Sequence, residues 1–345
     1  MRYQKQVIDQ IEKCYALTMI EQDGTPLLAV AGEKDAPCRL YDLDGSRADQ
    51  VWDKPGGVMT MVPVPDGNGT FLSTQAFFSP DDSKDARLIC AQRHHDRWKL
   101  TRILDIPHIH RFDVIPKDGI NYVIACTLKS GHEYSGDWRC PGRIWTGVLP
   151  EEPTQPLKLS LFRDGLTHNH GYTRSIKDGE IRSVISCDEG VFLVTPPAQP
   201  ESEWTIAQLL EEPTSDAVLM DLDGDGEDEL LTLSPFHGDT LSIWHLAAGT
   251  YQKVYAYPEK LPFLHAITAG AVYGRPTVFV GHREGRRSLL GFYYDRARKR
   301  YEFDVLDENT GAANCLLFSR DGHPALLVTN REIDEAAIYD VFPDD

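Results

Sequence analysis

The stretch His110-Arg-Phe-Asp-Val-Ile-Pro-Lys-Asp-Gly-Ile-Asn-Tyr-Val-Ile124 contains the unit from which the whole chain is built. Two runs rich in β-branched and aromatic residues flank an Asp-Gly pair, which predicts two antiparallel strands joined by a tight turn. Six other stretches open in the same way, and most of them carry the same Asp-Gly pair. The seven hairpins start near residues 14, 58, 109, 169, 216, 264 and 313.

A second hairpin follows the first in each unit, as in residues 241–255 and 289–305, so each unit holds four strands. The starts are roughly 44–60 residues apart, and four short strands repeated at such a period are typical of propeller blades. The sequence therefore predicts an all-β fold, a seven-bladed β-propeller with four-stranded blades that forms a single domain over residues 1–345. Two stacked β-sandwiches are the alternative. The repeated signature of WD40 proteins is absent, since a Trp-Asp pair occurs only once, at residues 52–53, and this argues against that class of propeller.

The two ends of the chain complement each other. The last unit stops after its third strand, residues 337–342, and the chain opens with a strand-like segment, residues 3–10, that has no partner of its own. We expect the two segments to pair, because this pairing completes the last blade and removes an exposed sheet edge.

Composition narrows the range of functions. The chain has 345 residues, 35 Lys and Arg against 53 Asp and Glu, a net charge of -18 and 41% hydrophobic residues. Such an acidic chain is repelled by the phosphates of nucleic acid and by an anionic membrane surface, so the composition argues against binding to either. No apolar run approaches the roughly 20 residues of a membrane span, and the first residues lack the apolar core of a signal peptide. Seven scattered cysteines without a CxxC pair suggest reduced thiols, so we expect a cytoplasmic protein. Its oligomeric state stays open.

One acidic stretch has the spacing of a cation-binding loop: Asp221-Leu-Asp223-Gly-Asp225-Gly-Glu227-Asp-Glu229. Carboxylates at positions 1, 3, 5 and 9, with the carbonyl of position 7, provide the oxygen ligands that Ca²⁺ prefers, and the two glycines permit the turn. The predicted calcium ligands are Asp221, Asp223, Asp225, Glu227 and Glu229. The predicted role is structural, since the loop joins two strands of one blade; an acidic hairpin without an ion is the alternative.

Propeller topology assigns the histidines to faces. The entry to the first strand of a blade and the loop after its second strand lie on one face of the disc. Eight of the twelve histidines fall at such positions: His108, His110, His132, His168, His170, His237, His265 and His282. We therefore expect them to gather at one mouth of the central channel.

Imidazoles converging from several blades suit a divalent transition metal such as Zn, Mn, Ni or Fe. The predicted ligands are His110, His170 and His265, with His237 as a fourth. His108 and His110 form one His-x-His pair, and His168 and His170 form another. Because alternate residues of a strand share a face, we expect both members of each pair to point to the channel. The alternative is that these histidines are polar caps that bind water and backbone carbonyls.

The same face collects further polar and aromatic residues. His132 is the predicted general base, because an imidazole titrates near working pH. Arg139 or Arg283 is expected to hold an anionic group, and Tyr134 to stack on a sugar ring. Glu133 is a further residue predicted on the channel face.

The acidic turn resembles the calcium-binding turn of the FG-GAP/VCBS propeller repeats. With the His-x-His pairs it is also similar to the propeller of the aldos-2-ulose dehydratases, and by analogy of fold and site the chain is similar to the oligogalacturonate lyases. These resemblances imply a metal-dependent carbohydrate lyase or dehydratase that acts on a small sugar or an oligosaccharide. Hydrolysis or epimerisation of a sugar at the same site is a second possibility. A non-catalytic propeller that binds a glycan or a protein partner is the competing hypothesis.

Overall fold

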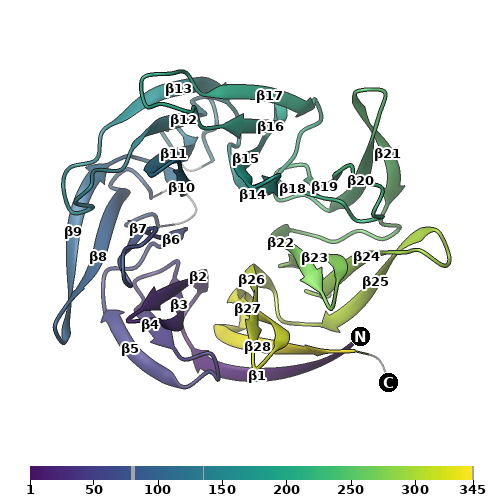
Figure 1. Cartoon of the computed structure of the whole chain (residues 1–345), viewed down its shortest axis with the longest axis horizontal. Coiled ribbons are helices and arrows are strands. Elements are labelled where there is room, and N and C mark those ends of the chain that lie inside the picture. Colours follow the sequence, from purple (N-terminus) through teal and green to yellow (C-terminus); the bar gives the residue numbers. More distant parts are fainter. Residues whose placement is uncertain (79–81, 135, 344–345) are drawn as a thin grey trace.

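The computed structural model describes residues 1–78, 82–134 and 136–343, and it forms a ring of seven four-stranded antiparallel sheets (Figure 1). The prediction of an all-β, seven-bladed propeller is confirmed, and the alternative of two stacked sandwiches is wrong. The described residues contain no α-helix and a single 3₁₀ turn, Arg331–Ile333. No helix in this part of the chain has the length and apolar character needed to cross a bilayer.

Each blade consists of four strands that follow one another in the chain, except for the last blade. In chain order the blades are β2 (Cys14–Gln22), β3 (Thr25–Gly32), β4 (Cys38–Tyr41) and β5 (Arg47–Trp52); β6 (Met61–Pro63), β7 (Phe71–Gln75), β8 (Arg87–His94) and β9 (Arg97–Asp105); β10 (Ile109–Lys117), β11 (Ile120–Lys129), β12 (Pro141–Val148) and β13 (Leu159–Leu166); β14 (Gly171–Lys177), β15 (Glu180–Cys187), β16 (Gly190–Thr195) and β17 (Thr205–Leu210); β18 (Asp216–Met220), β19 (Glu229–Ser234), β20 (Thr240–Ala247) and β21 (Thr250–Ala256); β22 (Leu264–Val272), β23 (Arg275–His282), β24 (Leu289–Asp295) and β25 (Arg300–Asp307); and β26 (Ala312–Arg320), β27 (His323–Asn330) and β28 (Glu335–Phe342) with β1 (Arg2–Gln10).

The first strand of each blade lies next to the central channel and the fourth at the rim (Figure 1). Strands near the middle of a blade are covered on both faces by neighbouring blades and read as continuous apolar runs; residues 122–129 of β11, for example, are all buried. The rim strand β13 of the same blade is mostly exposed. The core therefore lies between blades, as where Ile115 and Tyr122 pack with Ile185 and Phe192 of the next blade.

The last blade is closed by the first strand of the chain. β1 pairs antiparallel with β28 from Arg2 opposite Phe342 to Gln10 opposite Glu335, as the sequence predicted. Asp9 of β1 also reaches the following blade, where its carboxylate accepts hydrogen bonds from Tyr41 Oη (2.6 Å) and Arg39 Nη1 (2.9 Å). The closing strand thus joins the last blade to the first, and the start of β1 lies beside the end of β28 at the rim (Figure 1).

Candidate functional site

One end of the central channel opens into a cavity of about 220 Å³, which we call the channel mouth. Its walls come from first-strand entries and from loops after second strands, the positions that the sequence analysis assigned to one face. The lining residues are Tyr15, Glu33, Met59, Phe77, His110, Leu128, Trp138, His170, Phe236, His237, Phe263, His265 and Arg283.

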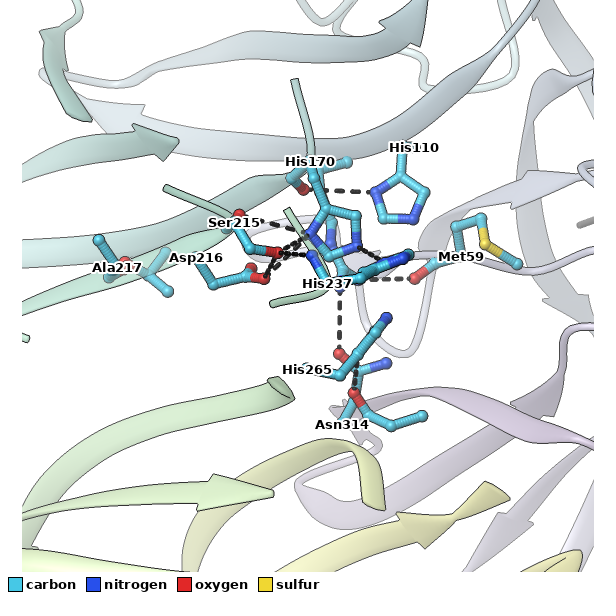
Figure 2. Close-up of polar contacts among 12 residues, drawn as sticks. Met59, His110, His170, Ser215, Asp216, Ala217, His237, His265 and Asn314 are labelled. Carbon is cyan, nitrogen blue, oxygen red and sulfur yellow. Dashed lines mark hydrogen bonds and ion pairs between the residues drawn. The ribbon is translucent and has the colours of Figure 1, made fainter. Parts of the chain in front are cut away.

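All four predicted metal ligands line the channel mouth (Figure 2). His170, His237 and His265 form the tighter set, because one nitrogen of each lies within 4.8 Å of those of the other two. His170 Nε2 and His237 Nε2 are 3.4 Å apart. His110 lies beside this set, with its ring centroid 4.5 Å from that of His170 and its Nε2 3.4 Å from Tyr15 Oη.

The Nδ1 atoms of three of these rings face hydrogen-bond acceptors in the surrounding fold. His170 Nδ1 donates to a carboxylate oxygen of Asp216 at 2.9 Å, and His265 Nδ1 donates to the carbonyl oxygen of Ala313 at 2.6 Å. His110 Nδ1 donates to the carbonyl oxygen of His170 at 3.3 Å. A neutral imidazole has one N–H, so these bonds leave the lone pair on Nε2 of each ring.

Burial favours the neutral form of three of these rings. It lowers the pKa of His110, of His237 and of His265 well below the usual histidine value. Neighbouring histidines and the guanidinium of Arg111 lower the three pKa values further, and that of Arg283 lowers those of His237 and His265. Neutral imidazoles with free lone pairs are the state in which histidine binds a metal.

A column of stacked rings crosses the channel mouth. Phe236 lies between His168 and His237, with centroid distances of 4.3 Å and 3.9 Å, and His237 stacks on Phe263 at 4.3 Å. The guanidinium of Arg283 lies 4.5 Å above the Phe263 ring and is ion-paired with Glu332 at 2.7 Å.

The first members of the two His-x-His pairs do not line the cavity, contrary to the prediction from strand alternation. His108 and His168 precede β10 and β14 and have left-handed φ angles of 63° and 49°, so the alternation of a strand does not apply to them. His108 Nδ1 contacts Ser83 Oγ at 2.7 Å, and His168 Nδ1 contacts Asp188 at 2.7 Å. Both are polar caps.

Four further predicted residues, His132, Glu133, Tyr134 and Arg139, belong to the loop between β11 and β12 and lie away from the cavity lining. The Tyr134 side chain is 60% exposed, and Arg139 is ion-paired with Asp137 and Glu133, both at 2.8 Å. The His132 ring packs edge-on against His108, with 5.2 Å between centroids. The structure does not bring these side chains to the four central histidines.

His282, at the end of β23, is held within its own blade. Its Nδ1 donates to the carbonyl oxygen of Pro262 at 3.3 Å, and its Nε2 accepts the Ser288 N–H at 2.9 Å. Both ring nitrogens are thereby used by the fold, so His282 is a structural cap.

Sequence reasoning missed the aromatic and acidic lining of the channel mouth. Phe236 directly precedes His237 in the chain, and Phe263 lies shortly before His265. The topological rule used for the histidines would therefore have found both phenylalanines. Tyr15 and Glu33 come from the first blade, where no histidine draws attention to them.

The predicted calcium loop lies on the opposite face, between β18 and β19. Asp223, Asp225 and Glu229 form a group with His245 of β20, whose Nε2 lies 2.9 Å from Asp225 Oδ2 and 3.7 Å from Glu229 Oε1. Asp221 stands outside this group and instead accepts the N–H groups of Gly224 and Gly226.

The fifth predicted calcium ligand, Glu227, also stands outside the group, and its carboxylate faces Lys177 Nζ at 3.6 Å. Glu229 is only 1% exposed and its Oε1 has no hydrogen-bond partner in the described residues. Burial raises the pKa of this carboxyl to about 7. Burying a carboxylate anion without a partner costs free energy, and a bound cation offsets this cost.

Calcium binding at this loop therefore remains a prediction. We expect Ca²⁺ at about 100 times its dissociation constant to raise the free energy of unfolding by about 2.7 kcal/mol. Glu229→Gln should abolish this gain, whereas Glu227→Gln, which alters a carboxylate of the same loop outside the group, should keep it. Thermal unfolding with and without Ca²⁺ measures both. Equal gains in the two variants would contradict the assignment.

Comparison with known proteins finds solved structures of similar fold but no match by sequence. No protein-family model and no curated protein matches the chain. The chain is similar to the β-propeller domain of Myceliophteria thermophila Cps50 (Swd1), with 11% identity, a TM-score of 0.63, and coverage of 98% of this chain and 100% of that one. It is also similar to Saccharomyces cerevisiae Sqt1 (11% identity, TM-score 0.57, 99% of each chain) and to the Dos1 propeller (8%, 0.57, 92% and 76%). At these identities the likeness shows the propeller fold.

These comparisons correct the functional predictions. The similar structures are WD40-type propellers, a class that is typically non-catalytic, although this chain lacks the repeated WD40 signature. The prediction of a metal-dependent lyase or dehydratase with a sugar substrate is therefore wrong, and no match supports the FG-GAP, dehydratase or lyase resemblance. The error has a physical origin, because a nine-residue turn and a set of histidine positions do not specify a reaction.

Proposed function

We propose that this chain is a non-catalytic propeller that binds a protein partner over the channel mouth. The observation that carries the proposal is the column of half-buried rings at an open cavity, built from the loops of several blades. The likeness to WD40-type propellers supports a protein as the partner.

The column has the properties of a binding anchor. Trp138, Phe236 and Phe263 each expose part of a ring beside the cavity, and aromatic rings provide much of the binding energy at protein interfaces. Phe236 and Phe263 stack on His237, and Trp138 packs edge-on against Phe236. These contacts hold the rings in place before a partner arrives, so little side-chain entropy is lost on binding.

Charge favours a basic partner surface. The chain carries 18 more negative than positive charges, and Arg283 and Arg331 at the mouth are already paired with Glu332 and Glu33. A field of one sign speeds association with an oppositely charged surface and weakens as salt screens it. We therefore expect association that slows as ionic strength rises.

A photo-crosslinking amino acid placed at position 236 should capture the partner in the cells that produce the protein. The same group at position 176 is the matched control, because Ile176 is 68% exposed at the end of β14 on the opposite face. The partner captured from position 236 alone is then purified, and Phe236→Ala should weaken its binding at least tenfold whereas Ile176→Ala should not. Equal binding by the two variants would refute the proposed docking surface.

A further inference from the structure

We propose that His170, His237 and His265 form a binding site for one divalent transition metal ion with the chemistry of zinc at the channel mouth. The three side chains come from three consecutive blades: His170 precedes β14, His237 lies between β19 and β20, and His265 is in β22. The site does not depend on the proposed partner.

The spacing of the nitrogens suits a metal better than a hydrogen bond. Zinc bound by imidazole has Zn–N distances of about 2.0–2.1 Å in a tetrahedron, which places two ligand nitrogens about 3.3–3.4 Å apart. His170 Nε2 and His237 Nε2 are 3.4 Å apart, whereas N–H donors in proteins usually lie about 2.9–3.0 Å from their acceptors. The third nitrogen, from His265, lies within 4.8 Å of both.

The hydrogen bonds around the site orient the lone pairs inward. The Nδ1 bonds of His170 to Asp216 and of His265 to Ala313 leave Nε2 as an acceptor on both rings. Tyr15 Oη lies 3.0 Å from His265 Nε2 and 3.4 Å from His110 Nε2, and its one proton serves only one of them. The Nε2 lone pairs of the clustered histidines (Figure 2) outnumber the protons that Tyr15 can donate to them, and a cation can bind the remaining lone pairs.

The buried carboxylate behind His170 is the outer partner that metal-bound histidines commonly have. Asp216 is 2% exposed, and its Oδ2 contacts His170 Nδ1 at 2.9 Å and Ser215 Oγ at 3.1 Å. Such a carboxylate fixes the ring and raises the basicity of the ligating nitrogen, and it gains from a nearby positive charge. Asp216 is thus a positioning residue for His170.

The ligand set selects the class of metal. Three imidazole nitrogens suit Zn²⁺, Co²⁺, Ni²⁺ and Cu²⁺ and disfavour Ca²⁺ and Mg²⁺, which prefer oxygen. The three nitrogens leave a tetrahedral ion one further position, which faces the cavity of about 220 Å³. A water molecule or a side chain of a bound protein fits there.

The test is a titration of the chelator-treated full-length protein with Co²⁺, followed by Zn²⁺. We expect one equivalent of Co²⁺ with the intense visible bands of a tetrahedral site, displaced by Zn²⁺. His237→Asn should lower the affinity at least tenfold, since it removes a ligand, and Asp216→Asn about 10–100-fold, since it removes the outer carboxylate.

The matched control is His168→Asn. His168 and His237 lie in the same ring column and have left-handed φ angles of 49° and 46°, which asparagine tolerates, but only His237 belongs to the nitrogen cluster. Circular dichroism checks that both variants fold. Absence of tetrahedral Co²⁺ bands, or bands that persist in His237→Asn, would overturn the proposal and identify a cluster held by hydrogen bonds alone.

Discussion

Deletion of residues 1–10 should lower the free energy of unfolding by more than about 3 kcal/mol, since a backbone hydrogen bond contributes about 0.5–1.5 kcal/mol net. β1 forms eight residue pairs with β28, and its loss exposes the edge of that strand. The bonds of Asp9 to Tyr41 and Arg39, which join the last blade to the first, disappear as well.

Urea denaturation of the full chain and of the deletion variant measures this effect. A synthetic peptide of residues 1–10, added in excess, should restore part of the lost stability because it can occupy the vacant edge. The single substitution Val7→Thr on the same strand is the control; this side chain is 49% exposed, so we expect a change within about 0.5 kcal/mol. A deletion variant as stable as the full chain would show that closure of the ring contributes nothing.

Asp113→Ala should cost about 3–5 kcal/mol, because it removes the buried acceptor of hydrogen bonds from Arg174 and Tyr172, and a hydrogen bond to a charged group contributes about 1.5–3 kcal/mol. The Arg174 side chain itself is 39% exposed. Asp113 in β10 is 3% exposed and accepts hydrogen bonds from Arg174 Nε at 2.6 Å and Nη2 at 2.5 Å. Tyr172 Oη donates to the same carboxylate at 2.6 Å. Both donors belong to β14, so the carboxylate ties two neighbouring blades together.

The matched control for Asp113→Ala is Asp164→Ala. Asp164 pairs with Arg143 at 3.1 Å, but its side chain is half exposed, so we expect a cost below about 1 kcal/mol. Chemical denaturation of both variants measures the difference. Asp113→Leu combined with Arg174→Met removes the guanidinium donors together with their acceptor and should recover part of the loss. If the double variant is no more stable than Asp113→Ala, donors left without an acceptor are not the cause of the loss.

The number of blades could be read from the sequence because tight turns are determined locally. At Asp23, Asp118 and Asp321 the backbone has φ angles of 51°, 51° and 50°, and the glycine that follows has a φ of 74° to 78°. Two consecutive left-handed residues define the hairpin turn that Asp-Gly favours, wherever in the chain it occurs. Four Asp-Gly turns of this kind, the fourth at residues 178–179, together with the regular spacing of the units therefore sufficed to count seven blades.

The candidate site could be predicted only in part, since it depends on contacts between distant segments. His110, His170, His237 and His265 follow from topology, because the start of a first strand and the loop after a second strand always reach the same face. The contact of Tyr15 with His265 joins residues 250 positions apart and has no local signature. The partnership of His245 with Asp225 and Glu229 likewise depends on which strand lies beside the turn.

The pairing of β1 with β28 also determines the order of events during biosynthesis. β1 leaves the ribosome before the other strands of the propeller, yet its partner β28 begins only at Glu335. At about 5–20 residues per second, translation keeps this strand waiting for roughly 20–60 s. The earlier blades can stack on one another during that time, but the ring cannot close until β28 has been made. A nascent chain that stalls before Glu335 therefore has a free β1 and an uncovered edge of β27, and it lacks β28, the strand that lies between the two in the closed blade.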